Sequence, residues 1–173
     1  MQNVTPLYTE TVISARIDAI ADEIARDHPG SFILAPVLTG AFVFAADLMR
    51  ALWSRGCDPE VDFVQLSSYG GARSSSGVVK LLKDFSIDIT GKSVVIVDDV
   101  LDTGRSLHFA QAMAVERGAT SSKICVLVRK NTGRSVDVDA DYVGFEAGPD
   151  EFLVGYGMDD DGLHRGLPYI GTV

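Results

Sequence analysis

Cysteine is scarce in this chain. Cys57 and Cys125 are the two present among 173 residues, and no CxxC spacing occurs. This usage argues against a disulfide scaffold and against a cysteine-based zinc site, so we expect two reduced, packed thiols in a cytoplasmic protein. A block of basic residues is also missing, and the net charge is −9. Non-specific binding of nucleic acid needs a positive surface, so we expect no nucleic-acid partner.

Long apolar runs are missing as well. The most apolar window, residues 32–49, is interrupted by Pro36, Gly40 and Asp47, and is too broken to span a bilayer. The amino terminus carries neither the basic nor the apolar region of a signal peptide, so we expect no membrane partner. Hydrophobic residues make up 46% and charged residues 23%, as in an ordinary globular protein. The length suits one domain.

Helical and strand-like patterns alternate along the chain. Apolar residues at steps of three and four indicate a helix at residues 8–28, and short β-branched runs indicate buried strands. Pro36 weakens the strand at 32–38, because proline cannot donate to a ladder. The alternation predicts an α/β protein with a mainly parallel sheet. The remaining predicted elements are helices at 41–53 and 105–117, strands at 32–38, 61–67, 78–82, 93–98, 123–128, 142–145 and 152–154, and an irregular end at 155–173.

The sequence SVVIVDDVLDTGRSL at residues 93–107 is the centre of the argument. It opens as a buried strand that we expect to end at Asp98 and Asp99, and ligands bind at the carboxyl ends of parallel strands. Successive strand side chains point to opposite faces, so the two carboxylates cannot serve one point within a regular strand. At a strand end, however, they can accept hydrogen bonds from the vicinal hydroxyls of a ribose. A solvated acidic strand end or a magnesium site is the alternative.

The next residues add a phosphate cradle to this strand end. Thr103, Gly104, Arg105 and Ser106 lead into a helix, whose first turn offers unpaired N–H groups to an anion. Simple capping of that helix by Thr or Ser is the alternative. The P-loop pattern GxxxxGK[ST] is absent, which disfavours ATP hydrolysis. Asp102 lies between the acid pair and the cradle, where it can exchange a proton with a base near C1 of a sugar. Together these residues predict a ribose 5-phosphate site.

At these residues the chain resembles a known family. VVIVDDVLDTGRSL resembles the phosphoribosyl-diphosphate motif of type I phosphoribosyltransferases, and Asp102 points to the branch that acts on 6-oxopurines. Residues 37–48 resemble the pyrophosphate loop and its helix, residues 67–77 the mobile active-site loop, and residues 152–170 the carboxyl-terminal base-binding hood. The resemblance covers about residues 32–171.

The resemblance implies the architecture of the whole chain. It implies the type I phosphoribosyltransferase fold, in which helices flank a mainly parallel central sheet and a small hood and a mobile loop are added. We expect a single domain over residues 1–173, with a core at about 8–145 and the hood at about 146–173.

The resemblance also implies a role for each matching position. Asp102 is implied as the acid/base at N7 of the purine, and the ribose hydroxyls are implied to lie on Asp98 and Asp99. The 5-phosphate would lie on Thr103, Gly104, Arg105 and Ser106, and the pyrophosphate on Leu38, Thr39, Gly40 and Arg165. The family often has a non-proline cis peptide bond at the pyrophosphate loop. The purine would be bound by Lys130 at O6, Phe152 by stacking and Leu153 through its backbone. The mobile loop would include Ser68 and Tyr69, and Mg²⁺ would be held by Asp159.

Two positions depart from the family pattern. Asp98 stands where Glu is commoner, and its shorter side chain favours a water-mediated contact with the sugar. Thr39 stands where some members carry Lys, and loss of that cation would weaken pyrophosphate binding or shift a subunit contact.

The implied function is purine salvage with Mg²⁺ as cofactor. The 5-phosphoribosyl group of phosphoribosyl diphosphate would pass to hypoxanthine, and to guanine, giving IMP or GMP and pyrophosphate. A xanthine-preferring or orotate-using enzyme of the same fold stays open, and so does a nucleotide-binding regulator such as the pyrimidine-operon attenuator. The acidic charge and Asp102 argue against the regulator. The family forms dimers and tetramers, so we expect a homodimer or homotetramer, with the apolar helix at 41–53 as a candidate interface.

Overall fold

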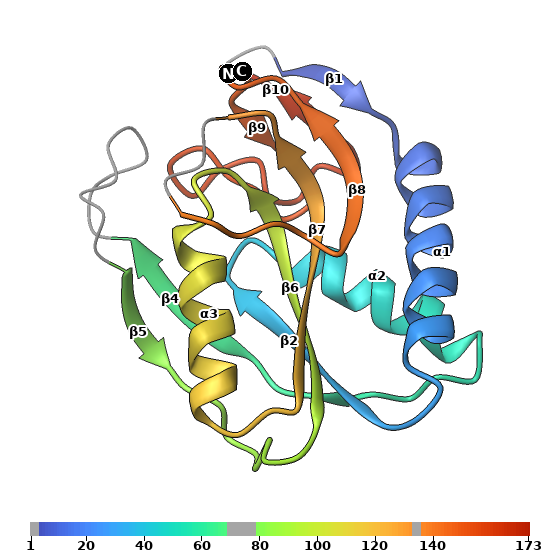
Figure 1. The fold of residues 1–173 in the computed structure, drawn as a ribbon. Coiled ribbons are helices and arrows are strands. Elements are labelled where there is room, and N and C mark those ends of the chain that lie inside the picture. The colour runs from blue at the N-terminus through green and yellow to red at the C-terminus, as the bar shows by residue number, and fades with distance from the viewer. Residues whose placement is uncertain (1–3, 69–78, 133–135) are drawn as a thin grey trace.

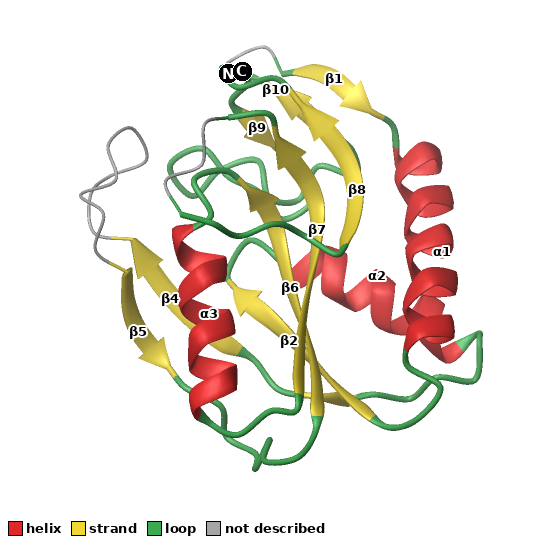
Figure 2. Cartoon of the chain, in the orientation of Figure 1, coloured by secondary structure: helices red, strands yellow, loops and turns green. Residues whose placement is uncertain are grey.

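The computed structural model describes residues 4–68, 79–132 and 136–173 (Figure 1). Helices alternate with strands through most of these ranges, as the sequence predicts (Figure 2). None of the helices in the described ranges is long and apolar enough to cross a bilayer. The helices are α1 (Glu10–Asp27), α2 (Phe42–Trp53) and α3 (Arg105–Glu116). The strands are β1 (Thr5–Tyr8), β2 (Phe32–Leu38), β3 (Glu60–Val61), β4 (Val64–Ser68), β5 (Val79–Lys83), β6 (Ser93–Leu101), β7 (Ser121–Lys130), β8 (Tyr142–Ala147), β9 (Leu153–Val154) and β10 (Ile170–Thr172).

The larger sheet is mainly parallel, which confirms the predicted fold class. Its strand order is β5-β4-β2-β6-β7-β8, and β3 pairs with β2 outside this path. Strands β2, β6, β7 and β8 run parallel, as do β3 and β4 beside β2, and β5 alone in this sheet pairs antiparallel, with β4. Because parallel strands end at one edge, the turns that follow β2 and β6 open on the same side of the molecule.

Helices cover both faces of this sheet, and β6 is buried between them. Val95 and Val97 pack in the cluster that includes α1 and α2, whereas Val94 and Ile96 pack in the cluster that includes α3. Figure 1 shows α3 apart from the other two helices. The continuous β-branched run is therefore explained as the sequence predicts, by burial on two faces.

Strand β2 forms in spite of Pro36. On the side away from β6, Leu34 pairs with Val61 of β3, and pairing resumes only at Val37, which lies opposite Val64 of β4. Pro36 lies opposite the break between β3 and β4, so its missing N–H costs no ladder bond on that side. The prediction of one continuous strand at 61–67 was wrong, because this segment forms two strands, β3 and β4, with Asp62 and Phe63 between them.

A second, three-stranded sheet has the order β1-β10-β9. Thr5 pairs with Thr172, and Gly171 pairs with Val154, so the two chain ends lie together (Figure 1). The sequence predicted neither β1 nor β10, and the prediction that residues 155–173 are irregular was wrong over β10. Both strands are short, and their pairing joins opposite ends of the chain, which no local pattern records.

Two strands also run further than predicted. Strand β6 continues to Leu101, so Asp98 and Asp99 lie within the strand and not at its end. Strand β7 continues to Lys130, in a segment predicted to be a polar connection, because Arg129 and Lys130 pair with β8. Backbone pairing holds these polar residues in the ladder, although their side chains break the apolar pattern.

Candidate active site

The turns after β2 and β6 meet at the carboxyl edge of the sheet. A Cβ atom added to Gly40 would lie only 1.8 Å from Oδ2 of Asp99. The absence of a side chain at Gly40 thus allows the backbone after β2 to touch the acid pair. The peptide bond between Leu38 and Thr39 is cis. The predicted pyrophosphate loop and the predicted sugar site are therefore neighbours in space.

Asp98 and Asp99 form a coupled acid pair. The backbone N–H of Asp99 donates to Oδ1 of Asp98 at 3.0 Å, and that of Val100 donates to Oδ1 of Asp99 at 2.7 Å. Each carboxylate bends along the chain toward the next N–H, so strand alternation does not separate the two groups. Burial and then the charge of Asp99 hold the pKa of Asp98 well above its ordinary value. Burial also raises the pKa of Asp99, although the hydrogen bonds with Asp98 and with the N–H of Val100, and less strongly the charge of Arg165, act in the opposite direction.

Asp102 lies just beyond β6 and remains accessible. Half of its side chain is exposed, whereas the side chain of Lys130 is 13% exposed. The Lys130 Nζ lies 3.9 Å from Oδ2 of Asp102. The hydroxyl of Thr132 donates to the backbone carbonyl of Asp102 at 3.2 Å. The end of β7 and the turn after β6 thus bring a cation and a carboxylate to one place.

Gly104 is the N-cap of α3, with φ of 79° in the left-handed region. A Cβ atom there would lie 2.5 Å from Cγ1 of Val138, so close packing also requires glycine. As a glycine, Gly104 offers no side-chain hydrogen bond to the first turn of the helix. The N-cap position itself is therefore taken by Gly104 and not by Thr103 or Ser106. Arg105 and Ser106 open the first turn of the helix, as the cradle prediction requires.

The segment after β9 brings Arg165 and Asp159 to the pyrophosphate loop. Nη2 of Arg165 lies 2.7 Å from Oδ1 of Asp159, and Nη1 donates to the carbonyl of Gly157 at 2.7 Å. A Cβ atom on Gly157 would lie 2.2 Å from the carbonyl oxygen of Gly40. Sequence reasoning gave Gly157 no role. Its signal was the Gly-Tyr-Gly spacing, which on its own indicates only a turn.

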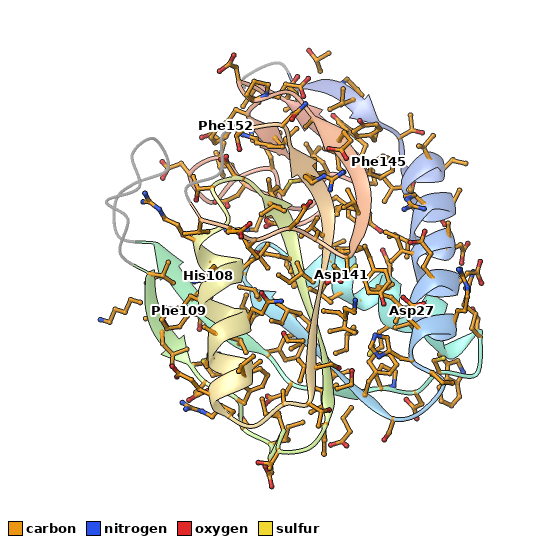
Figure 3. The ribbon with its side chains drawn as sticks, in the orientation of Figure 1. Asp27, His108, Phe109, Asp141, Phe145 and Phe152 are labelled. Carbon is orange, nitrogen blue, oxygen red and sulfur yellow. The ribbon has the colours of Figure 1, made fainter. Side chains whose placement is uncertain are left out.

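The predicted purine residues lie at the same end of the molecule. Leu153 is buried in β9 and Phe152 is half-buried just before it. Figure 3 shows Phe152 at the end where β6 and β7 finish. Ser68 ends β4, where it pairs with Val79. Tyr69 lies outside the described residues.

Comparisons with known proteins agree with this geometry. A family model described as the phosphoribosyl transferase domain matches residues 4–161. The hypoxanthine-guanine phosphoribosyltransferase of Streptococcus thermophilus is 39% identical over 168 residues, covering 96% of this chain and 91% of that protein.

Solved structures are equally similar. A hypoxanthine-guanine phosphoribosyltransferase of Bacillus anthracis, solved with HEPES in its active site, has a TM-score of 0.90 at 40% identity and covers 99% of both chains. The hypoxanthine phosphoribosyltransferase of Trypanosoma cruzi has a TM-score of 0.90 at 37% identity, with 98% of this chain and 90% of that chain covered. The chain therefore belongs to the type I phosphoribosyltransferases, in the hypoxanthine-guanine branch.

Proposed function

We propose that the protein is a purine-salvage enzyme that transfers the 5-phosphoribosyl group of phosphoribosyl diphosphate to hypoxanthine and guanine. The products are IMP or GMP and pyrophosphate. The observation that carries this proposal is the convergence of Asp102 and Lys130, 3.9 Å apart, beside the acid pair of β6. This arrangement sets a proton-handling carboxylate and a hydrogen-bond donor next to a candidate sugar site. The names of the similar proteins support the same reaction.

The carboxyl ends of β2 and β6 would hold the phosphoribosyl diphosphate. Asp98 and Asp99 accept hydrogen bonds from the ribose hydroxyls, and residues 103–106 bind the 5-phosphate at the start of α3. The pyrophosphate lies on residues 38–40 and contacts Arg165. The close approach of Gly40 to Asp99 supports this assignment, because one ligand can touch both turns.

The purine would lie between β7 and the hood. Lys130 donates to O6 of the base, Phe152 stacks on the ring, and the backbone of Leu153 meets its edge. The Lys130 side chain has a low exposure. Because lysine side chains usually lie in solvent unless they have a partner, this burial supports a role in ligand contact. Ser68, at the end of β4, would belong with Tyr69 to the loop that the resemblance assigns to the active site.

The reaction breaks the bond from C1 to the diphosphate and forms a bond from C1 to a purine nitrogen. Positive charge develops on the ribose in the transition state, and negative charge leaves on the diphosphate. Asp102 exchanges a proton with N7 of the base. Arg165 neutralises charge on the diphosphate, because a preformed cation needs no reorganisation during the reaction.

Mg²⁺ would accompany the diphosphate. Among the described residues, no three potential ligands of the types His, Cys, Asp or Glu cluster around one point. Magnesium usually binds through one or two carboxylates together with substrate phosphates, so Asp159 fits such a partial site. Bound magnesium would supply further charge neutralisation at the leaving group. The contacts of Asp159 with Arg165 and with the N–H of Gly162 keep its carboxylate near the pyrophosphate loop.

We also propose a homodimer or homotetramer, located in the cytoplasm. Phe42, Met49 and Trp53 are 42%, 39% and 67% exposed and share a face of α2, which suits a contact between copies. The two free cysteines suit a reducing compartment. We retain one domain with a core at about 8–145 and a hood at about 146–173, to which β1 is joined by pairing with β10. Light scattering of the purified protein tests the oligomer, and a monomer would contradict it.

Activity is tested by nucleotide formation. The protein is incubated with magnesium, phosphoribosyl diphosphate and one of hypoxanthine, guanine, xanthine, uracil or orotate. We expect IMP and GMP, and no pyrimidine nucleotide. Preferential formation of XMP would replace the proposal with a xanthine enzyme. Absence of every nucleotide product, with retained binding of nucleotides, would favour a regulator of the same fold.

A further inference from the structure

The hood contains a tight turn at residues 155–158. The N–H of Gly155 donates to the carbonyl of Met158 at 3.0 Å, and the N–H of Met158 donates back at 3.1 Å. Its two central residues, Tyr156 and Gly157, have φ of 52° and 102°. Positive φ at both central positions is typical of a type I′ turn, and it is uncommon for a bulky residue such as tyrosine. The side chain of Tyr156 makes a hydrogen bond that can hold the residue in this uncommon conformation.

The Tyr156 side chain joins the turn to α2. The ring is buried, with the residue 7% exposed, and its hydroxyl donates to Oδ2 of Asp47. The other oxygen of Asp47 accepts from Nη1 of Arg50 at 2.7 Å. Burial, then the hydrogen bond to Asp47, raises the pKa of the Tyr156 phenol above its ordinary value. The residue is thus anchored to the helix that begins directly after the pyrophosphate loop.

The same turn contacts both predicted pyrophosphate-binding elements. Gly157 lies against the carbonyl of Gly40 so closely that a Cβ atom would not fit. Its N–H donates to the carbonyl of Arg165 at 3.0 Å, and its own carbonyl accepts from the guanidinium of that residue at 2.7 Å. Arg165 is therefore held at its backbone and at its side chain by one residue. A shift of the turn would move the guanidinium relative to the loop.

We propose that Tyr156 is a positioning residue for pyrophosphate: its hydrogen bond to Asp47 fixes the 155–158 turn on α2 and so sets Arg165 against Gly40. This inference rests on the proposed function, which assigns Gly40 and Arg165 to the pyrophosphate. Tyr156 touches neither substrate nor the reacting atoms in this role. We expect its effect on the diphosphate half of the site, because the turn contacts Gly40 and Arg165 directly. Leu153, two residues before the turn, is held separately by its pairing with Thr172, and Lys130 lies on β7.

The principal test is Tyr156→Phe, which removes the hydroxyl and keeps the ring. We expect the affinity for magnesium pyrophosphate, measured by calorimetry, to fall about tenfold, as for a lost hydrogen bond to a charged group. KM for phosphoribosyl diphosphate should rise by a similar factor, while KM for hypoxanthine changes by less than about twofold. Equal rises in both KM values, or unchanged pyrophosphate affinity, would overturn the inference.

A matched control separates positioning from general stability. Tyr142 is also buried, and its hydroxyl donates to Oδ2 of Asp27 at 2.9 Å, at the far end of α1 from Phe152 (Figure 3). Tyr142→Phe therefore removes a comparable hydrogen bond away from the site. We expect this variant to lose stability as Tyr156→Phe does but to bind pyrophosphate normally. Weakened pyrophosphate binding in both variants would reduce the role of Tyr156 to stability.

A second variant tests the partner. Asp47→Ala removes the acceptor, and its effect on pyrophosphate affinity should not add to that of Tyr156→Phe, because both break one contact. Arg50→Gln, on the exposed side of Asp47, should leave affinity unchanged. Additive losses would overturn the inference. A wild-type protein that binds pyrophosphate but forms no nucleotide would contradict the proposed function, while the calorimetric comparison still decides the role of Tyr156.

Discussion

Two carboxylates in this protein are almost equally buried, but their surroundings shift their pKa values in opposite directions. Asp62, after β3, is 6% exposed, and Asp98, in β6, is 8% exposed. Burial acts to raise the pKa of Asp62, but the N–H of Ser86 and the ammonium of Lys83 outweigh it, and its pKa lies below the ordinary value. Burial and the neighbouring Asp99 charge together raise the pKa of Asp98.

The difference separates a structural anchor from the proposed binding site. Nζ of Lys83 lies 3.1 Å from Oδ1 of Asp62, and the N–H groups of Ser86 and Ile87 donate to the other oxygen. These contacts join β3 to the end of β5 and leave little for a ligand to add. Asp98 instead lies beside a second acid, an arrangement that a ligand with two hydroxyls can relieve. We infer that the protein pairs a buried carboxylate with a cation where it supports the fold, as at Asp62, and sets two acids side by side at the proposed sugar site.

The largest expected effect concerns the third acid at the strand end, which is neither buried nor tightly paired. Asp102→Asn should lower turnover by about a hundredfold to ten-thousandfold, the range typical of a lost general acid or base. Thermal stability should not change, because half of the side chain is exposed. Steady-state kinetics and a melting curve measure both effects. A fully active variant would remove Asp102 from the proposed mechanism.

The next effect comes from the contact between Gly40 and the acid pair. Gly40→Ala would place a methyl group 1.8 Å from Oδ2 of Asp99, so the short carboxylate or the loop must move. We expect kcat/KM for phosphoribosyl diphosphate to fall roughly tens-fold, since small displacements in a site are costly. Gly30→Ala is the control, because its Cβ would meet no atom within 4 Å. Similar kinetics for both variants would show that the contact is unimportant.

Asp62→Asn should change stability without changing the site. Losing the charge opposite Lys83 should cost about 2 kcal/mol of unfolding free energy at neutral pH. Since the folded pKa of Asp62 is depressed, its stabilisation is present above the unfolded value, near pH 4, and is lost as pH falls through the folded pKa. Urea unfolding at several pH values should show this loss, with the exposed Asp58→Asn as control. An unaltered midpoint at pH 7 would contradict the anchor role.

Asp98→Asn should shift stability in the opposite direction and by less. Because the folded pKa of Asp98 is raised, the carboxylate destabilises the folded state increasingly as pH rises above its unfolded pKa, near 4. The variant should gain about 1 kcal/mol at pH 7 and nothing below pH 4, while KM for phosphoribosyl diphosphate rises. Unfolding curves and kinetics measure the two changes. A loss of stability at pH 7 would break the contrast with Asp62.

Local pattern predicted the sheet class and the three helices of the described residues. The run before Asp98 is apolar on both faces, and the turn at Gly104 needs a residue without a side chain, so neighbouring residues record these features. The assigned roles of Asp102 and of the cradle remain predictions, and so does the role of Tyr69. The strand boundaries were less predictable. Backbone pairing carried β6 and β7 through polar residues that a pattern of hydrophobicity treats as ends.

Residues adjacent in the chain thus suffice to predict the strand, the acids and the helix start of the proposed sugar-phosphate site, because those features depend on side-chain alternation and local backbone geometry. Packing between distant segments set the rest. Several contacts join parts of the chain that lie far apart in sequence: Gly40 with Asp99, Gly157 with Gly40, and β1 with β10. The second acid beside Asp98 is visible in the sequence, but the anchor role of Asp62 depends on Lys83 and Ser86, which reach it from a distant segment and which its neighbours in sequence do not indicate.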